Sequence, residues 1–115
     1  MSDARKHFER AVQLQTAGAW AEALAAYQSC LNEDPTHVDA AIGIARLREL
    51  RGQWSYATEA WQAVLERVPD HREAATARAE SLRQAGCFHR ALRAYDTALR
   101  LDPNNLYALA GKAEC

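Results

Sequence analysis

Apolar residues recur along the chain at spacings of three and four residues, and the pattern returns three times. The first copy of this apolar stripe comprises Trp20, Ala23, Leu24, Tyr27 and Leu31. The later copies are Trp54, Ala57, Trp61, Val64 and Leu65, and then Phe88, Ala91, Leu92, Tyr95 and Leu99. Such spacing predicts helices that bury one face, so we expect these stripes to lie in the core, including their leading aromatics Trp20, Trp54 and Phe88. Alternation of strand type does not occur, and the sequence predicts an all-α protein.

Glycine and proline mark the expected ends of these helices, and both recur at one constant period, the step from Gly18 to Gly52. The glycines are Gly18, Gly52 and Gly86, and glycine readily adopts the left-handed conformation that follows a helix. The prolines are Pro35, Pro69 and Pro103, and proline disfavours helical geometry in the residue before it. Two pairs, Thr36 with Asp39 and Asp70 with Glu73, resemble capping boxes at the start of the following helices.

The repeated unit also has a recognisable set of residues. The middle copy has a small residue in its first helix, a Gly–x–aromatic turn, an alanine and an aromatic in its second helix and a final proline: Ala45, Gly52, Trp54, Ala57, Trp61 and Pro69. This pattern resembles the tetratricopeptide repeat family. The resemblance implies a right-handed α-solenoid of stacked antiparallel helix pairs. We expect a single domain over residues 1–115, with repeats at 4–37, 38–71 and 72–105 and a partial or capping helix at 106–115. Stacking is needed because no single pair can bury its own apolar face.

Composition narrows the function classes. The 14 basic residues are matched by 15 acidic ones, for a net charge of −1, which argues against a nucleic-acid binder. No apolar run approaches the roughly 18 residues that a membrane-spanning helix needs, and the N-terminal residues lack the apolar segment of a secretory signal. The three cysteines have no C-x-x-C spacing, so neither a disulfide framework nor a zinc ribbon is indicated. A reducing, cytoplasmic location is expected.

Catalytic and metal-binding residues are not expected in this chain. None of the common nucleotide-binding, hydrolase or zinc-protease motifs occurs. His37 and His71 occupy equivalent places in successive repeats, where we expect solvated loop side chains and not ligands that converge on one ion. Cys30 is expected to be buried and inert, and Cys87, beside a turn glycine, to be exposed. The sequence therefore predicts a protein that is not an enzyme and has no cofactor or metal.

A second stripe runs along each predicted first helix at spacings of three, four and three residues. Its members are Arg5, Phe8, Val12 and Gln15, then Asp39, Ile42, Arg46 and Glu49, and then Glu73, Thr76, Glu80 and Arg83. Spacing alone places each set on one helix face. The family resemblance implies that this face lines a concave groove that holds a partner's peptide or helix. Exposed apolar side chains at Phe8, Val12 and Ile42 would suit an apolar anchor. An ordinary solvated face is the alternative, and the polar majority of the stripe favours it.

The resemblance also allows one kind of partner to be tested. Family members that serve the large heat-shock chaperones hold the partner's C-terminal carboxylate with lysine, asparagine and arginine side chains. The corresponding positions here are Phe8, Val12, Gly43, Glu73 and Ala77. None of these side chains can donate a hydrogen bond to a carboxylate, and Glu73 would repel it. A clamp for chaperone tails is therefore disfavoured.

The favoured hypothesis is a scaffold that binds a peptide or protein partner in the concave groove. The alternative is a regulatory or substrate-recruiting domain cut from a larger multidomain enzyme. Leu106, Leu109, Ala110 and Ala113 share the spacing of a packing face near the end of the chain. This face would equally serve self-association through an open C-terminal helix.

Overall fold

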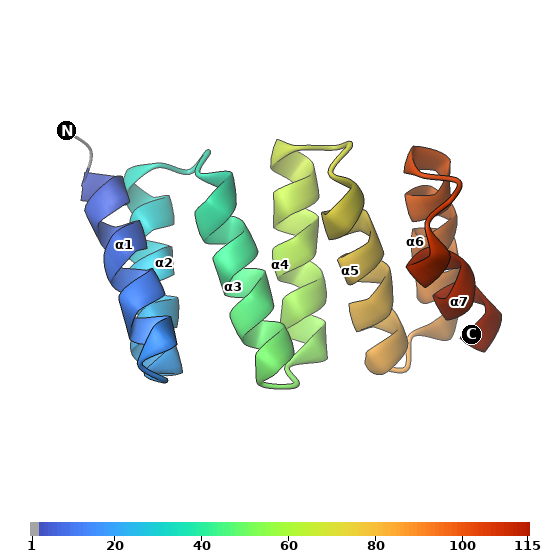
Figure 1. Cartoon of the computed structure of the whole chain (residues 1–115), viewed down its shortest axis with the longest axis horizontal. Helices are drawn as coiled ribbons and strands as arrows, with labels where there is room; N and C mark the ends of the chain where they lie inside the picture. The colour runs from blue at the N-terminus through green and yellow to red at the C-terminus, as the bar shows by residue number, and fades with distance from the viewer. Residues whose placement is uncertain (1–2) are drawn as a thin grey trace.

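The computed structural model describes residues 3–115, so the first two residues of the predicted domain lie outside the described part. Within this range the chain forms seven helices and no strand. The helices are α1 (Asp3–Thr16), α2 (Trp20–Glu33), α3 (Val38–Leu50), α4 (Trp54–Arg67), α5 (Arg72–Gln84), α6 (Phe88–Leu101) and α7 (Leu106–Glu114). Figure 1 shows them standing side by side along the long axis of a molecule that measures 44 × 25 × 19 Å. The predicted all-α solenoid is confirmed.

The three periodic glycines end the first helix of each pair, as predicted. Gly18, Gly52 and Gly86 have φ angles of 84°, 68° and 83°. A Cβ atom on any of them would meet nothing within 4 Å. The requirement for glycine therefore lies in the left-handed backbone itself and not in a lack of space.

The predicted capping boxes are wrong, because histidines cap the helices instead. Nδ1 of His37 accepts a hydrogen bond from the backbone N–H of Ala40 at 3.1 Å, and the equivalent nitrogen of His71 accepts from Ala74 at 3.0 Å. The Thr36 hydroxyl instead donates to Asp34 at 2.7 Å. The N-cap histidines are half-buried and not solvated as expected, since each satisfies an amide that the first helical turn leaves without a partner.

Asparagine does the same work at the start of α7. Oδ1 of Asn105, which stands one full repeat after His71, accepts from the N–H of Ala108 at 3.1 Å. Three consecutive repeats thus place a side-chain acceptor at the same N-cap position. Histidine is not among the usual capping residues, so the two histidine caps could not be predicted from residue type, whereas asparagine is a preferred N-cap residue.

The core forms where small residues of the first helices meet aromatics of the second helices. Trp61 and Tyr95 are fully buried, and Ala45 and Ala79 pack in the same clusters. Cys30 is also fully buried, as predicted. These contacts repeat from pair to pair, which is how stacking creates a continuous core that no single pair would have.

The leading aromatics are less buried than predicted. Trp20 and Trp54 are half-buried, and Phe88 is 52 % exposed. The guanidinium of Arg51 covers the Trp20 ring at 4.1 Å, whereas the structure records no such cover over Phe88 in residues 3–115. Cys87, expected to be exposed, is half-buried against the cluster that contains Tyr95. The burial of these turn residues therefore depends on which side chains pack against them.

Candidate functional site

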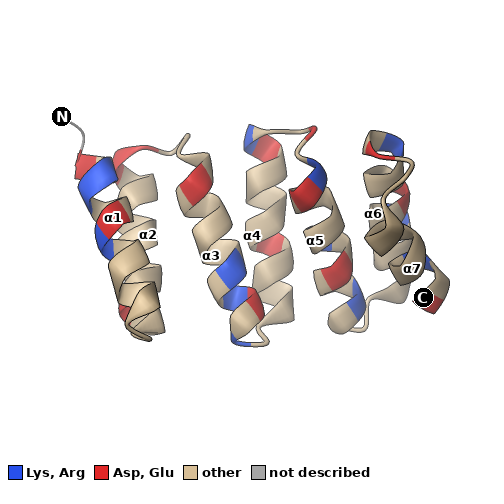
Figure 2. Ribbon diagram, viewed as in Figure 1, with Lys and Arg blue, Asp and Glu red and all other residues tan. Residues whose placement is uncertain are grey.

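The twelve residues of the predicted binding stripe lie on α1, α3 and α5, and none of them is buried. Figure 2 shows charges of both signs along these helices. Most of these side chains are not part of the core and remain accessible, although Phe8 and Ile42 pack partly against it. Their arrangement, however, is not the uniform surface that the spacing alone suggested.

A groove of about 660 Å³ opens between α3, α5 and α7. Six of the twelve predicted residues line it: Arg46, Glu49, Glu73, Thr76, Glu80 and Arg83. The other lining residues are Arg72, Ala77, Asn105, Tyr107, Ala110, Gly111 and Glu114. The stripe residues of α1, together with Asp39 and Ile42, lie outside this lining.

Extending the repeat period to α7 would have found several of the missed residues. Tyr107, Ala110 and Glu114 stand one full repeat after Glu73, Thr76 and Glu80. They therefore continue the same helix face into the last helix. The binding stripe predicted from the sequence ended at Arg83 and did not include these residues of α7.

The predicted apolar end of the groove is only partly exposed. The ring of Phe8 packs on Tyr27 with centroids 5.8 Å apart and on His37 at 5.0 Å, and it is half-buried. Ile42 is also half-buried, against the core cluster that contains Trp61. Val12 remains 41 % exposed. The expectation that Phe8 and Ile42 are exposed was wrong, because the N-cap His37 and the aromatics of the second helices close over the positions.

Aromatic residues of the core hold several stripe residues in place. The Tyr27 hydroxyl donates to Oε1 of Gln15 at 2.7 Å. The Tyr95 hydroxyl donates to Oε2 of Glu80 at 2.8 Å. Burial raises the pKa of Tyr95 to about 12, which keeps this hydroxyl a hydrogen-bond donor. The hydroxyl of each buried tyrosine thus holds one stripe residue of a first helix in position.

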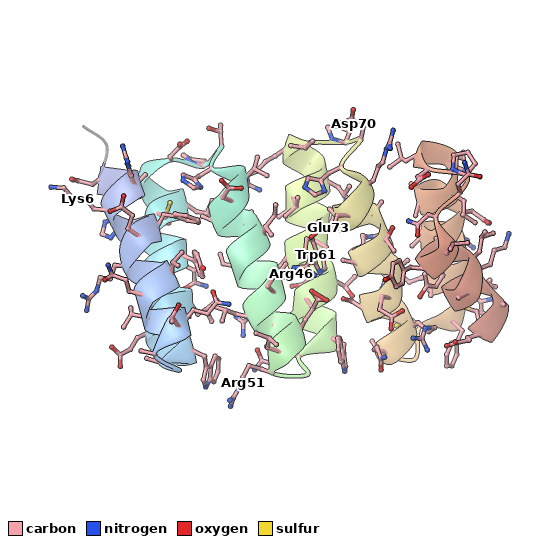
Figure 3. The ribbon with its side chains drawn as sticks, in the orientation of Figure 1. Lys6, Arg46, Arg51, Trp61, Asp70 and Glu73 are labelled. Atoms are coloured by element: carbon pink, nitrogen blue, oxygen red, sulfur yellow. The ribbon has the colours of Figure 1, made fainter. Side chains whose placement is uncertain are left out.

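Two arginines tie neighbouring first helices together along the groove. Arg46 pairs with Glu49 of α3 at 3.1 Å and with Glu73 of α5, and its guanidinium lies 4.8 Å from the centre of the Trp61 ring. Figure 3 shows Arg46, Trp61 and Glu73 gathered between α3 and α5. Arg83 of α5 pairs with Glu114 of α7 at 3.1 Å. The walls of the groove are therefore joined by ion pairs that cross from repeat to repeat.

Burial and hydrogen bonding shift the acidity of two lining carboxylates in opposite directions. Burial raises the pKa of Glu49, and the nearby charge of Arg46 offsets this only in part. Burial also raises the pKa of Glu80, but hydrogen bonds from Tyr95, Gln84 and Arg83 outweigh it and lower the pKa overall. Its hydrogen bonds therefore stabilise the charged form of Glu80, whereas burial disfavours the charged form of Glu49.

The groove presents groups that can form hydrogen bonds, ion pairs and apolar contacts with a ligand. Its lining offers carboxylates, guanidinium groups, an amide, a hydroxyl and the small apolar surface of Ala77, Ala110 and Gly111. Across residues 3–115, no group of three or more His, Cys, Asp or Glu could hold a metal ion. In the same range, no helix has the length and apolar character needed to cross a bilayer.

Comparison with known protein families decides the classification. A tetratricopeptide repeat model matches residues 14–80, and a second tetratricopeptide repeat model matches residues 72–105. The chain belongs to the tetratricopeptide repeat family. No curated protein sequence matches this tetratricopeptide chain.

Several solved structures share the fold of this chain at low sequence identity. The second tetratricopeptide domain of human RPAP3, in complex with the HSP70 peptide SGPTIEEVD, is 16 % identical with a TM-score of 0.84, covering 96 % of this chain and 92 % of that one. The first such domain of Spaghetti, bound to the HSP90 peptide SRMEEVD, is 18 % identical with a TM-score of 0.83, covering 96 % and 88 %. A MamA crystal structure is 13 % identical with a TM-score of 0.87, covering 98 % and 66 %. At these identities the likeness establishes the fold alone.

Proposed function

We propose that this tetratricopeptide chain is a protein-interaction scaffold that binds a partner's peptide or helix in the groove between α3, α5 and α7. The observation that carries the proposal is the groove itself, whose volume of about 660 Å³ suits several peptide side chains. Its lining contains half of the independently predicted stripe. The stripe residues that remain solvent-accessible on α1 and α3, such as Arg5, Val12 and Asp39, extend this surface toward the N-terminus. The scaffold acts in the cytoplasm and performs no catalysis.

The proposed partner is not a chaperone tail of the kind bound by the RPAP3 and Spaghetti domains. Gly43, at a position where the family resemblance implies an asparagine in chaperone-binding members, lies against the Tyr27 ring, and a Cβ atom there would come within 2.5 Å of it. A larger side chain therefore does not fit without moving that ring. Glu73 already pairs with Arg46, and Ala77 has no donor to offer. We expect an SRMEEVD peptide to bind no better than a scrambled control.

Selection from a library of random peptides displayed on phage tests whether the groove binds peptides. Peptides that bind the wild-type chain are measured against Ala110→Trp, which fills the groove from an exposed position on α7. The matched control is Ala25→Trp, since Ala25 is exposed on α2 and does not line the groove. We expect Ala110→Trp to weaken binding by about tenfold or more, with no change for Ala25→Trp.

Circular dichroism and the melting temperature of both variants establish that the fold is intact. Selected peptides that bind Ala110→Trp as tightly as wild type would place the binding surface elsewhere. Failure to select any peptide would argue against a peptide-binding scaffold altogether.

A further inference from the structure

The charges that line the groove are not balanced. Three arginines (Arg46, Arg72 and Arg83) face four glutamates (Glu49, Glu73, Glu80 and Glu114), which leaves a net charge of −1 within the lining. The difference is small by number. Its effect on a ligand depends on which of these groups are already engaged and which face the solvent.

Two of the three arginines, Arg46 and Arg83, are already paired with carboxylates of the lining, whereas the described residues show no ion pair for exposed Arg72. Arg83 donates through its Nη2 and Nε atoms to Glu80 and through Nη1 to Glu114, and its side chain is only 22 % exposed. Arg46 uses one terminal nitrogen for Glu49 and the other for Glu73, with its flat face over Trp61. Both terminal nitrogens of each guanidinium thus already have a carboxylate partner, although the Arg46 side chain remains 41 % exposed.

The carboxylates that pair with these arginines keep unused capacity. The side chains of Glu73 and Glu114 are 61 % and 60 % exposed. Within residues 3–115 the structure records a partner for only one oxygen of each, Oε1 of Glu73 and Oε2 of Glu114. The second oxygen of each can still accept from a donor, because a carboxylate offers about four acceptor sites. A ligand entering the groove thus meets free acceptors at two points, one beside α3 and one beside α7.

Two further features suit the stem of a long cationic side chain. Ala77, Ala110 and Gly111 line the groove with small apolar surface, along which the methylene groups of lysine or arginine can lie. Tyr107, which is 84 % exposed, also lines the groove, and an aromatic face attracts a cation.

We propose that the groove selects a peptide that carries lysine or arginine side chains and discriminates against an acidic one. This inference rests on the proposed function, since it names the charge of the peptide that the groove would hold. A cationic side chain gains an ion pair with the free oxygen of Glu73 or Glu114. An acidic one is placed beside the like charge of these two carboxylates, and among the lining arginines only Arg72 has no ion pair recorded in residues 3–115.

Charge-matched peptides test the inference. Peptides selected from the displayed random library are synthesised with blocked ends in three versions, with lysine, glutamine or glutamate at the same two positions. At low salt we expect the wild-type chain to bind the lysine version about tenfold more tightly than the glutamate version, the size expected from two exposed ion pairs. The preference should shrink as salt is added.

Charge reversal in the protein identifies the responsible residues. The double variant Glu73→Lys, Glu114→Lys should prefer the glutamate version, and Glu73→Gln with Glu114→Gln should lose the preference for the lysine version. Glu59→Lys is the control, because Glu59 is exposed on α4 and lies outside the groove lining. It should keep the wild-type preference.

The outcomes separate the inference from the proposed function. Peptides that depend on the groove, as judged with Ala110→Trp, but show no preference for lysine would overturn the inference and leave the scaffold intact. A preference that survives both double variants would overturn it as well. If no selected peptide depends on the groove, both proposals fail.

Discussion

The close approach of Gly43 to Tyr27 gives a prediction whose sign the structure determines. A Cβ atom at position 43 would lie 2.5 Å from Cζ and 2.6 Å from Cε1 of the Tyr27 ring. The ring cannot simply turn away, because Tyr27 is only 3 % exposed and its hydroxyl is bonded to Gln15 at 2.7 Å. Gly43→Ala must therefore displace a buried side chain.

Two opposing effects set the magnitude. Alanine in place of glycine in a helix interior stabilises by about 1 kcal/mol. Overpacking of a core costs about 1–3 kcal/mol, and loss of the bond between Tyr27 and Gln15 costs about 1 kcal/mol more. Since the losses exceed the gain, we expect Gly43→Ala to lower the free energy of unfolding by about 1–3 kcal/mol.

Urea unfolding with linear extrapolation measures this difference. The matched experiment makes the same change in a Tyr27→Leu background, where the shorter side chain removes the clash. There Gly43→Ala should stabilise the protein relative to Tyr27→Leu alone, through helix propensity. An equal effect in both backgrounds, or a stabilised Gly43→Ala in the wild-type chain, would show that Tyr27 does not constrain position 43.

Three further changes probe the core, the caps and the thiols. Trp61→Ala should cost about 3–5 kcal/mol of unfolding free energy, and Trp54→Ala clearly less because Trp54 is half-buried; equal losses in urea unfolding would contradict the observed burial. His71→Ala should cost about 1 kcal/mol, whereas His71→Asn keeps an acceptor and should melt near the wild-type temperature; similar melting of the two variants would refute the capping role. A thiol reagent followed by mass spectrometry should label exposed Cys115 in the folded protein but Cys30 only after unfolding, since burial raises the pKa of the Cys30 thiol; early labelling of Cys30 would contradict its burial.

The helices were predictable because their signals are local. The left-handed backbone at position 52 favours glycine, and Pro69 ends the preceding helix. Both signals can be recognised from the local sequence alone. The constant repeat period then assigns the same role to every copy. Helix stripes such as that of Trp61 follow from spacing in the same way.

Burial of a side chain by residues that lie far along the chain could not be predicted from helical spacing. Phe8 was expected to be exposed, but its burial depends on His37, which lies far along the chain at the start of α3 and caps that helix. Phe88 was expected in the core, yet its equivalent Trp20 owes its cover to Arg51, which belongs to another column of the repeat. Spacing identifies the face on which a residue lies, but the side chain opposite decides whether that face is covered.

For the groove, too, the sequence predicted the helix face on which each residue lies but not the contacts between helices. Helical spacing predicted that Arg46 and Glu73 lie on equivalent helix faces, and both line the same groove. It did not reveal that they pair with each other across two helices. Nor did it show that Arg83 is mostly covered by its own ion pairs. The charge that a ligand meets is therefore a property of the stack and not of any single helix.

The position of α7 has a consequence for affinity. This helix forms one wall of the groove, but it is short and its main contacts are with α5 and α6. Opening of α7 would remove this wall, so the groove is complete only in the fraction of molecules with α7 docked. The apparent dissociation constant equals the intrinsic one divided by that fraction. The ion pair of Arg83 with Glu114 and the cap formed by Asn105 both hold α7 in place. We therefore expect them to affect binding through that fraction, in addition to any direct contact with the ligand.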